Sequence, residues 1–495
     1  MTTSRLSCAI ESFNNLTTPQ KLVIITCFGL LLRLYVTIYA VTIATDAITH
    51  LRLVKEFTGG NLYGIFDMDR PPLYALCVSL TSFIIPDPVV AGRVVSLVFG
   101  TLTIPLSFYI GRFVYGSRAG LLTAFFLAIH PYLVRYSGEV LTEGLYYFIT
   151  SLVILVGLKV VRDKGYALAV VLGVAASLAY LTKPGAMGYM MILSAIIFLA
   201  YPSRLRSEFP RRILVIIIAW AAFLVVSSPY LYYLSQASGE VIMTGRGGAG
   251  DVMATAGRIV TTGLYFIDFG TAYPEAYTYP FFLLFLIFLW KLPGRVISRD
   301  ITERELWIFA IQIFYFGIYM VAGARRRYLV QIMPLGVVFS AVGFIYLADR
   351  IKLRKKEGAA VAIAVLLLVF TAVQLPKALV RLKAHHLPEK TAGLWLAEYG
   401  GKGTTILTRT PIMVYYAGGT YVGLPPGMVT LAELLDYAGD EGAEFIAGYS
   451  RILKRNVSDF EAERDRRLEV VKVFEPVYTG SRDDGDEFVV YRPVD

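Results

Sequence analysis

Residues 43–74 read IATDAITHLRLVKEFTGGNLYGIFDMDRPPLY and form a polar, charged stretch between long apolar runs. Asp46 opens the stretch, and four apolar residues follow it at helical spacing: Ile48, Leu51, Val54 and Phe57. This pattern predicts an amphipathic helix that lies along a membrane surface. Arg70 then precedes two prolines, which hold the segment extended and end any helix. The stretch therefore predicts a loop that fixes a carboxylate and an arginine over a bilayer.

The composition of the chain is that of a polytopic membrane protein. Its 495 residues are 56% hydrophobic and only 17% charged, and the mean hydropathy is +0.60. No ordinary soluble domain of this length combines these values. The net charge of +10 comes mostly from basic residues in short loops between apolar runs. We therefore interpret it as a signal of membrane orientation and expect no nucleic-acid partner.

Apolar runs long enough to cross about 30 Å of hydrocarbon occur about eleven times, at roughly 20 residues per helix. They lie near residues 21–41, 89–111, 119–135, 141–161, 166–182, 185–201, 213–233, 277–290, 306–323, 328–347 and 359–376. The first run lacks a lysine-rich start and a small-residue cleavage site, so we expect it to be retained as a span. The chain is thus predicted to be an α-helical polytopic membrane protein.

Residues 73–85 are apolar but form a shorter run, bounded by Pro72 and Pro86. If this run does not cross the membrane, every second loop carries Lys and Arg, and these loops are all cytoplasmic under the positive-inside rule. If it did cross, they would all lie outside. We therefore predict a re-entrant or surface helix over residues 73–85.

This arrangement places a group of ionisable residues on the external face: Asp46, His50, Arg70, Arg135, Glu139, Glu143 and Lys183. The turn over residues 323–328 is also external, and it holds three arginines, including Arg326 and Arg327, where the rule expects few. Burying a charge near a membrane interior costs roughly 2.5 to 3.5 kcal/mol, so this turn is expected to have an anionic partner. Arg93, about one turn inside the second span, is also expected to have an anionic partner.

After residue 387 the hydropathy falls, and β-rich runs alternate with helical patterns. Strands are predicted over residues 404–408, 444–449, 468–474 and 487–491, and helices over 389–399 and 431–438. This pattern predicts a small extracytoplasmic α/β domain. The chain is accordingly divided into a membrane domain, residues 1–384, and a C-terminal domain, residues 385–495. The cysteines at positions 8, 27 and 77 give the latter no disulfide framework.

Each candidate site residue also has a purely structural explanation. Asp46 could be the N-cap of its helix, and Lys183 could be a snorkelling lysine before a proline. His50, four residues after Asp46, is a further candidate as its helix-face partner. Glu139 and Glu143 stand four residues apart on one helical face. A few carboxylates among many cations suit a substrate that brings a phosphate and a hydroxyl to be deprotonated.

Several short motifs, in this order, resemble the extracytoplasmic GT-C glycosyltransferases, especially the protein O-mannosyltransferase and lipid A aminoarabinose transferase branch (glycosyltransferase families 39 and 83). The similar pieces are Asp46 followed by Pro71-Pro72-Leu73, Arg93 with residues 103–106, residues 136–143, residues 181–184, and Arg327-Tyr328. The chain departs from the mannosyltransferases at Ala47, where Glu is usual, and at Arg70, where His is usual. It also lacks their inserted domain between late spans.

The resemblance implies transfer of a sugar from a polyprenyl-phosphate carrier to an acceptor hydroxyl, with inversion at the anomeric carbon. Asp46 would be the general base, with Glu143 and Glu139 orienting acceptor or base. A set of cations and one tyrosine would bind the donor phosphate: Arg70, Arg93, Lys183, Arg326, Arg327 and Tyr328.

The expected partners are this lipid-linked donor, membrane lipids and a lipid, glycan or protein acceptor. No cofactor or metal ligand set is predicted, and a divalent metal is left open. The expected location is the plasma membrane, multi-pass, with the active site and C-terminal domain extracytoplasmic. A transporter or flippase of lipid-linked sugars is the alternative function. Because the ionisable residues gather at one face instead of mid-membrane, the pattern favours an enzyme.

Overall fold

The computed structural model of the chain describes residues 12–13, 15–245, 264–322, 326–351, 356–401, 403–475 and 486–494. The chain divides into two compact units. The helical unit comprises Met1–Ile38 and Leu53–Val380, and the C-terminal unit comprises Tyr39–Arg52 and Arg381–Asp495. Each unit is described by itself.

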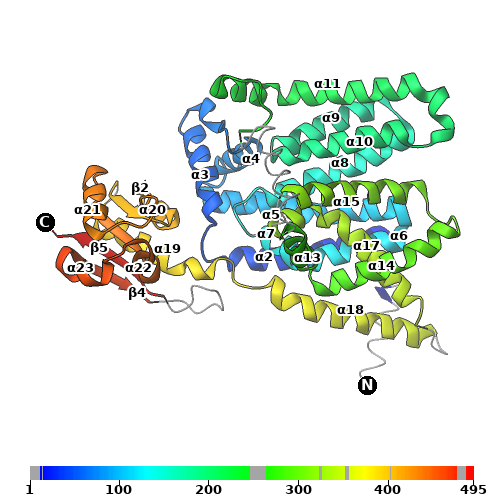
Figure 1. The fold of residues 1–495 in the computed structure, drawn as a ribbon. Coiled ribbons are helices and arrows are strands. Elements are labelled where there is room, and N and C mark those ends of the chain that lie inside the picture. The colour runs from blue at the N-terminus through cyan, green and yellow to red at the C-terminus, as the bar shows by residue number, and fades with distance from the viewer. Residues whose placement is uncertain are drawn as a thin grey trace. The chain divides into compact units, whose positions relative to one another are not determined.

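The helical unit consists of long helices that lie side by side (Figure 1). In chain order they are α2 (Thr18–Ile38), α3 (Thr45–Thr58), η1 (Leu62–Ile65), α4 (Leu73–Ser82), α5 (Pro88–Tyr115), α6 (Ser117–Ile129), α7 (Pro131–Tyr136), α8 (Glu143–Asp163), α9 (Tyr166–Tyr180), η2 (Pro184–Ala186), α10 (Met187–Leu199), η3 (Pro202–Arg204), α11 (Leu205–Ser238), α13 (Leu264–Tyr277), α14 (Tyr279–Ile297), α15 (Glu303–Ala322), α16 (Arg326–Leu329), η4 (Val330–Ile332), α17 (Met333–Ala348) and α18 (Lys356–Ala378). The boundary between the two units falls inside α3.

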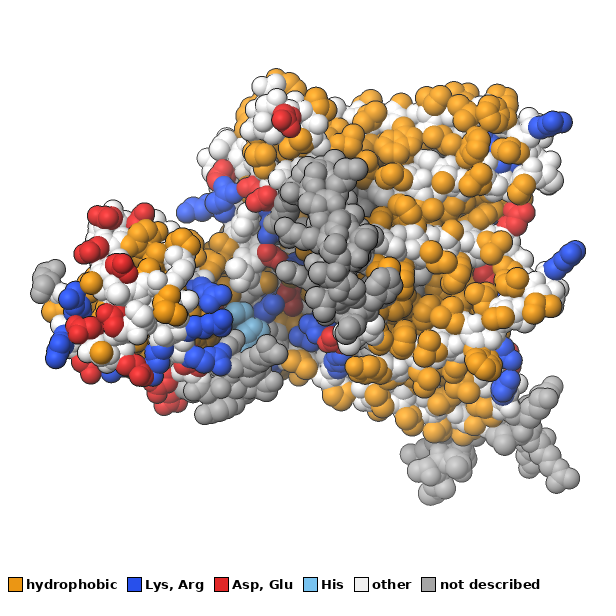
Figure 2. Space-filling view, in the orientation of Figure 1, with side chains coloured by type: hydrophobic (Ala, Val, Ile, Leu, Met, Phe, Trp, Pro, Cys, Tyr) orange, Lys and Arg blue, Asp and Glu red, His pale blue; other side chains and the backbone are white. Residues whose placement is uncertain are grey.

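The helices confirm the predicted polytopic membrane protein. Among the described residues, seven helical segments are long and apolar enough to cross a membrane: Thr18–Ile38, Pro88–Tyr115, Glu143–Asp163, Pro202–Ser238, Tyr279–Ile297, Arg326–Ala348 and Gly358–Ala378. The other four predicted spans coincide with α6, α9, α10 and α15, of which the first three are only 13, 15 and 13 residues long. Figure 2 shows a wide band of hydrophobic side chains across this unit.

Residues 73–85 decide the sidedness of the whole chain, and the first ten of them form the short helix α4. Its length of about 15 Å is half the thickness of the hydrocarbon layer. The backbone N–H of Leu73, the first residue of α4, donates to the carbonyl of Leu181 at 3.0 Å. The start of α4 therefore lies beside the end of α9.

Loops that the charge pattern assigns to the same side contact one another. Three contacts join the loops predicted to be cytoplasmic: Arg118 with Asp349 at 2.8 Å, Arg304 with the Phe113 carbonyl at 3.1 Å, and Arg211 with the Lys164 carbonyl at 3.0 Å. The loops predicted to be external meet at the opposite end of the helices, for example Leu73 with Leu181. The helices thus alternate in direction as the charge pattern requires, and which end faces the cytoplasm stays a prediction.

The C-terminal unit is built on a five-stranded sheet (Figure 1). The strands are β1 (Thr405–Thr408), β2 (Thr420–Val422), β3 (Phe445–Tyr449), β4 (Leu468–Phe474) and β5 (Phe488–Pro493), in the order β2-β1-β3-β5-β4. The first three strands are parallel, and β5 and β4 are antiparallel to their neighbours. The four predicted strands are present, and the short strand β2 was not predicted.

Helices cover both faces of this sheet, because alternate residues of each strand point to opposite sides. Ile406 and Phe445 pack with α19 (Leu387–Tyr399) and α20 (Pro411–Ala417). Leu407 and Ile446 pack with α21 (Leu431–Asp440), α22 (Ser450–Asn456) and α23 (Phe460–Arg467). Helices α19 and α21 match the two predicted helices, and the unit is a three-layer α/β/α domain.

The segment Tyr39–Arg52 belongs to the C-terminal unit, although it is distant in sequence. The Val41 N–H donates to the Leu382 carbonyl at 3.1 Å, and Lys390 Nζ donates to the Val41 carbonyl at 2.8 Å. Thr42 Oγ1 donates to the Tyr416 hydroxyl at 3.1 Å. This association was not predicted, and it places Asp46 within the C-terminal unit.

Candidate active site

One buried carboxylate in the helical unit binds two of the predicted phosphate-binding cations. Lys183 Nζ and Arg327 Nε donate to the same oxygen, Oε1 of Glu143, at 2.9 and 2.6 Å. The Glu143 side chain is 0% exposed, whereas those of Lys183 and Arg327 are 20% and 34% exposed. Its second oxygen, Oε2, is buried and has no hydrogen-bond partner among the described residues. This Glu143 cluster carries one net positive charge, and its cations have accessible surface.

The start of α8, which carries Glu143, is fixed by close packing against α5. A Cβ atom on Gly144 would lie 2.6 Å from the backbone oxygen of Ser96, and one on Gly100 would lie 2.1 Å from Ser137 Oγ. Ser96 Oγ also donates to the Leu141 carbonyl at 3.2 Å. The small residues of α5 therefore let the segment before Glu143 rest directly on that helix.

Lys183 is held in place by the proline that follows it. The residue before a proline is pushed out of the helical region, and Lys183 is extended, with φ −151° and ψ 128°. The chain thus leaves α9 at this point, and the Lys183 N–H bonds to the Ala179 carbonyl at 2.9 Å. The ammonium lies 5.5 Å from the centre of the Tyr146 ring, a cation–π contact that adds to its orientation.

A second charged cluster contains Arg326 and three residues that the sequence did not single out. Arg326 forms an ion pair with Glu275, and the Tyr132 hydroxyl donates to the same Glu275 oxygen at 3.2 Å. Arg326 and Lys377 lie 4.9 and 4.8 Å from the centre of the Tyr132 ring. Partial burial alone would raise the pKa of Glu275, but the hydrogen bond and the charge of Arg326 lower it below its ordinary value.

The other predicted residues of the helical unit are Glu139, Arg93, Arg70 and Tyr328. Glu139 is buried in the loop before α8, and Arg93 lies on α5. The Arg70 backbone N–H donates to Asp67 Oδ1 at 3.0 Å, so an aspartate turn shapes this segment. Tyr328 stacks on Tyr319, with ring centres 6.4 Å apart. Residues 323–325 of the arginine turn lie outside the described residues.

Asp46 and His50 both lie on the part of α3 that belongs to the C-terminal unit. Helix α3 spans Thr45–Thr58, and Asp46 lies in its first turn. Its charge favours this position, because the N-terminus of a helix carries a partial positive charge. The buried residues of α3 are Ala47, His50, Leu51, Leu53 and Val54. Of the predicted apolar stripe, Leu51 and Val54 are buried within the protein, whereas Ile48 and Phe57 are half-buried.

The C-terminal unit contains a cavity of about 220 Å³ at the carboxyl ends of β1 and β3. These strands are parallel, and the chain passes from β1 to β2 on one side and then to β3 on the other side of β1, so the strand order reverses between β1 and β3. Open parallel sheets bind ligands at such a point. Glu389 is buried there, and it accepts from Thr410 Oγ1 at 2.7 Å and lies 3.0 Å from His386 Nδ1. The exposed Arg409 and Thr45 also line the cavity. It offers both a carboxylate and a guanidinium to a polar ligand.

Some of these site residues left a signal in the sequence that could have been used. Glu275, Lys377 and Tyr132 each lie near the predicted external end of an apolar run, as the predicted residues do. Glu389 stands three residues after His386 at the start of a predicted helix. Within the described residues there is no group of three or more His, Cys, Asp or Glu side chains that could hold a metal ion.

Comparison with known proteins identifies the fold. Residues 69–233, a third of the chain, match the family of dolichyl-phosphate-mannose-protein mannosyltransferases. A search of curated proteins found no match. The apo oligosaccharyltransferase of Archaeoglobus fulgidus is 13% identical, with a TM-score of 0.62 over 97% of this chain and 77% of its own.

A second solved structure covers nearly the whole of both chains. ArnT from Cupriavidus metallidurans, bound to undecaprenyl phosphate, is 13% identical, with a TM-score of 0.59 over 95% of this chain and 97% of its own. At such identities the likeness shows the fold, which is the one expected from the sequence motifs. The chain is therefore a polytopic membrane protein with the fold of the GT-C glycosyltransferases.

Proposed function

We propose that this protein is a membrane glycosyltransferase that moves a sugar from a polyprenyl-phosphate carrier to an acceptor hydroxyl. The observation that carries the proposal is the Glu143 cluster. Two cations that come from distant parts of the chain meet on one buried carboxylate and keep accessible surface. Such a preorganised pair suits a phosphate group, because cations and phosphates form strong charge-assisted hydrogen bonds.

In the proposed reaction the acceptor oxygen attacks the anomeric carbon of the sugar from the face opposite the phosphate. A new carbon–oxygen bond forms, the bond to the phosphate oxygen breaks, and its electron pair stays on the phosphate. Lys183 and Arg327 stabilise the charge that develops there, which lowers the barrier. The acceptor proton passes to the carboxylate of Asp46, the proposed general base, and the sugar is inverted. Glu143 is held as an anion by its two partners, so its proposed role is to position them.

The comparisons support a lipid-linked donor. The family that matches residues 69–233 is described by its use of dolichyl-phosphate-mannose. The ArnT structure holds undecaprenyl phosphate, and another structure of the Archaeoglobus fulgidus enzyme holds a dolichol-phosphate. We propose a donor of this class, an acceptor that is a lipid, glycan or protein, and a reaction at the extracytoplasmic face of the plasma membrane.

The donor site is tested by measuring the binding of undecaprenyl phosphate to the purified protein in detergent. We expect Lys183→Ala and Arg327→Ala each to weaken binding by about tenfold or more, because a hydrogen bond to a charged group is worth about 1.5–3 kcal/mol. Arg118→Ala is the control, since Arg118 of α6 pairs with Asp349 just after α17, whereas Arg327 lies before the start of α17. Unchanged affinity in both test variants would contradict a shared phosphate site.

We further propose that the cavity of the C-terminal unit takes a hydroxyl-bearing part of the acceptor. Thr45 in its wall directly precedes Asp46, the proposed base, within the same unit. The carboxylate of Glu389 can accept from sugar hydroxyls, and Arg409 can donate to them.

Glu389→Gln and Arg409→Ala are therefore expected to lower sugar transfer several-fold and leave the binding of undecaprenyl phosphate unchanged. Transfer is followed by mass spectrometry of the glycolipids and glycoproteins of cells that express each variant. Glu433→Gln, which changes a carboxylate in the capping box of α21 instead, is the control. Normal transfer in both cavity variants would contradict an acceptor site there.

A further inference from the structure

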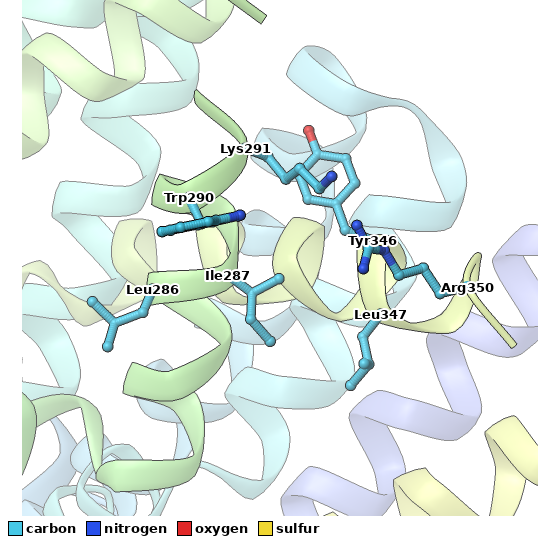
Figure 3. A pocket seen from close by; sticks show the side chains of 7 residues that line it. All are labelled: Leu286, Ile287, Trp290, Lys291, Tyr346, Leu347 and Arg350. Carbon is cyan, nitrogen blue, oxygen red and sulfur yellow. The ribbon is translucent and has the colours of Figure 1, made fainter. Parts of the chain in front are cut away.

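A groove lies between α14 and α17, away from both charged clusters. The two helices run in parallel, and the first turns of α14 approach the middle of α17 closely. Ser340 Oγ donates to the Phe281 carbonyl at 2.9 Å, and a Cβ atom on Gly343 would lie 1.9 Å from the Leu284 carbonyl oxygen. Beyond Gly343 the facing residues are large, and they enclose a cavity of about 310 Å³. Its lining consists of Leu286, Ile287, Trp290, Lys291, Tyr346, Leu347 and Arg350 (Figure 3).

The groove combines two cations with an apolar wall. Figure 3 shows the charged ends of Lys291 and Arg350 gathered around Tyr346, with the aliphatic side chains of Ile287 and Leu347 beside them. Within the described residues, neither Lys291 nor Arg350 has an ion-pair partner. The nearby Arg295 differs, because it is paired with the buried Glu305. The groove thus has two uncompensated positive charges that an anion could approach.

The position of the groove places it at a membrane–water boundary. On one side its lining ends at Arg350, two residues after the candidate span Arg326–Ala348. On the other side it ends at Lys291, the first charged residue of the candidate span Tyr279–Ile297. Trp290 is 81% exposed beside it, and exposed tryptophans are typical of the interfacial belt. The same end of the bundle carries the loops that are rich in Lys and Arg. Basic pockets between membrane helices on such a side bind the headgroups of anionic lipids.

We propose that this groove binds the phosphate headgroup of an anionic membrane phospholipid. Lys291 and Arg350 contact the phosphate, and an acyl chain follows Ile287 and Leu347 into the membrane. The site is separate from the proposed donor site, because Arg327 lies before the start of α17 and Arg350 follows its end. The 16 residues of α17 extend about 24 Å.

The test is the retention of lipid by the purified full-length protein, measured by native mass spectrometry after equal exposure to phosphatidylglycerol or phosphatidylcholine. We expect selective retention of phosphatidylglycerol. The double variant Lys291→Ala/Arg350→Ala should bind it about 25-fold more weakly, since each cation near an anionic lipid surface contributes about fivefold. The charge-preserving variant Lys291→Arg/Arg350→Lys should retain it, which separates lost charge from a general loss of packing.

The matched control is Arg204→Ala/Arg206→Ala, which removes two exposed cations at the same end of the bundle but outside the groove. It should retain phosphatidylglycerol as the unmodified protein does. Equal loss in this control, or full retention in Lys291→Ala/Arg350→Ala, would overturn the proposal. Displacement of the lipid by millimolar inorganic phosphate would show that the groove recognises free phosphate and would overturn the lipid assignment.

Discussion

At the scale of single residues, Glu143 illustrates how far sequence reasoning reached. The positive-inside rule predicted that Lys183 and Arg327 share a side of the membrane, and the exceptional arginine turn predicted an anionic partner. The structure supplies that partner for Arg327 in Glu143, 184 residues away in the chain, and Lys183 shares it at a separation of 40 residues. Sequence spacing could not predict which carboxylate binds which cation, because that pairing depends on how the helices pack.

Asp46 is either the general base or only a charge that stabilises the start of α3, and these two interpretations predict different results for one substitution. Asp46→Asn keeps the size of the side chain and removes its charge. Loss of the favourable charge in the first turn of α3 should cost only about 0.3–1 kcal/mol of stability. If Asp46 is the general base, sugar transfer should fall by roughly a hundredfold or more, with undecaprenyl phosphate binding retained.

Mass spectrometry of glycolipids and glycoproteins measures the transfer, and ligand binding to the purified protein is measured in parallel. Glu56→Gln, which neutralises another carboxylate of α3, serves as the control and should transfer normally. Near-normal transfer by Asp46→Asn would remove Asp46 from the mechanism and make Glu139 the next candidate for the base.

At the scale of elements, hydrophobic periodicity predicted the helices and strands that contain a clear run of apolar residues. All eleven predicted spans are helices, and four strands of the C-terminal sheet lie where β-rich runs occur. Strand β2 was missed because it has only three residues, of which Thr420 and Tyr421 are exposed. The association of Tyr39–Arg52 with the C-terminal unit was missed because it rests on backbone hydrogen bonds between distant segments, such as Val41 with Leu382. Such bonds leave no pattern in the sequence.

Close helix packing at Gly144 gives a prediction about α8. In Gly144→Ala the added Cβ would clash with the Ser96 backbone, so the start of α8 must move away from α5. Overpacking of this kind costs about 1–3 kcal/mol, and the shift should also weaken undecaprenyl phosphate binding. Gly294→Ala in α14 is the matched control, because nothing lies within 4 Å of the added atom. It should be neutral or stabilise by about 0.5–1 kcal/mol.

Thermal unfolding in detergent compares the stability of the two glycine variants, and ligand binding compares their sites. Equal stability of the two variants would mean that the α5–α8 contact relaxes at no cost. Lower stability with unchanged binding in Gly144→Ala would separate the packing of α8 from the position of Glu143.

At the scale of the whole molecule, the side predicted for each loop from its charge agrees with the direction in which the helices run. Loops assigned to one side by their Lys and Arg content meet at one end of the helices, as Arg118 and Asp349 do. The loops without such a charge excess meet at the other end, where Glu143 binds Lys183 and Arg327. The alternation depends on α4, since a crossing of the membrane there would have reversed the direction of every later helix.

The last prediction therefore concerns sidedness, tested with single cysteines in a chain whose Cys8, Cys27 and Cys77 are replaced by serine. The positive-inside rule predicts that Tyr63→Cys, in the exposed loop before α4, and Glu469→Cys, on the exposed edge strand β4, react with a membrane-impermeant maleimide in intact cells. Arg206→Cys, at the opposite end of the bundle, should react only after the membrane is permeabilised. Labelling of Arg206→Cys alone in intact cells would invert the orientation and place the Glu143 cluster in the cytoplasm. Labelling of Tyr63→Cys and Arg206→Cys from the same side would contradict the alternation of the helices itself, because α4 to α10 would then cross the membrane an even number of times.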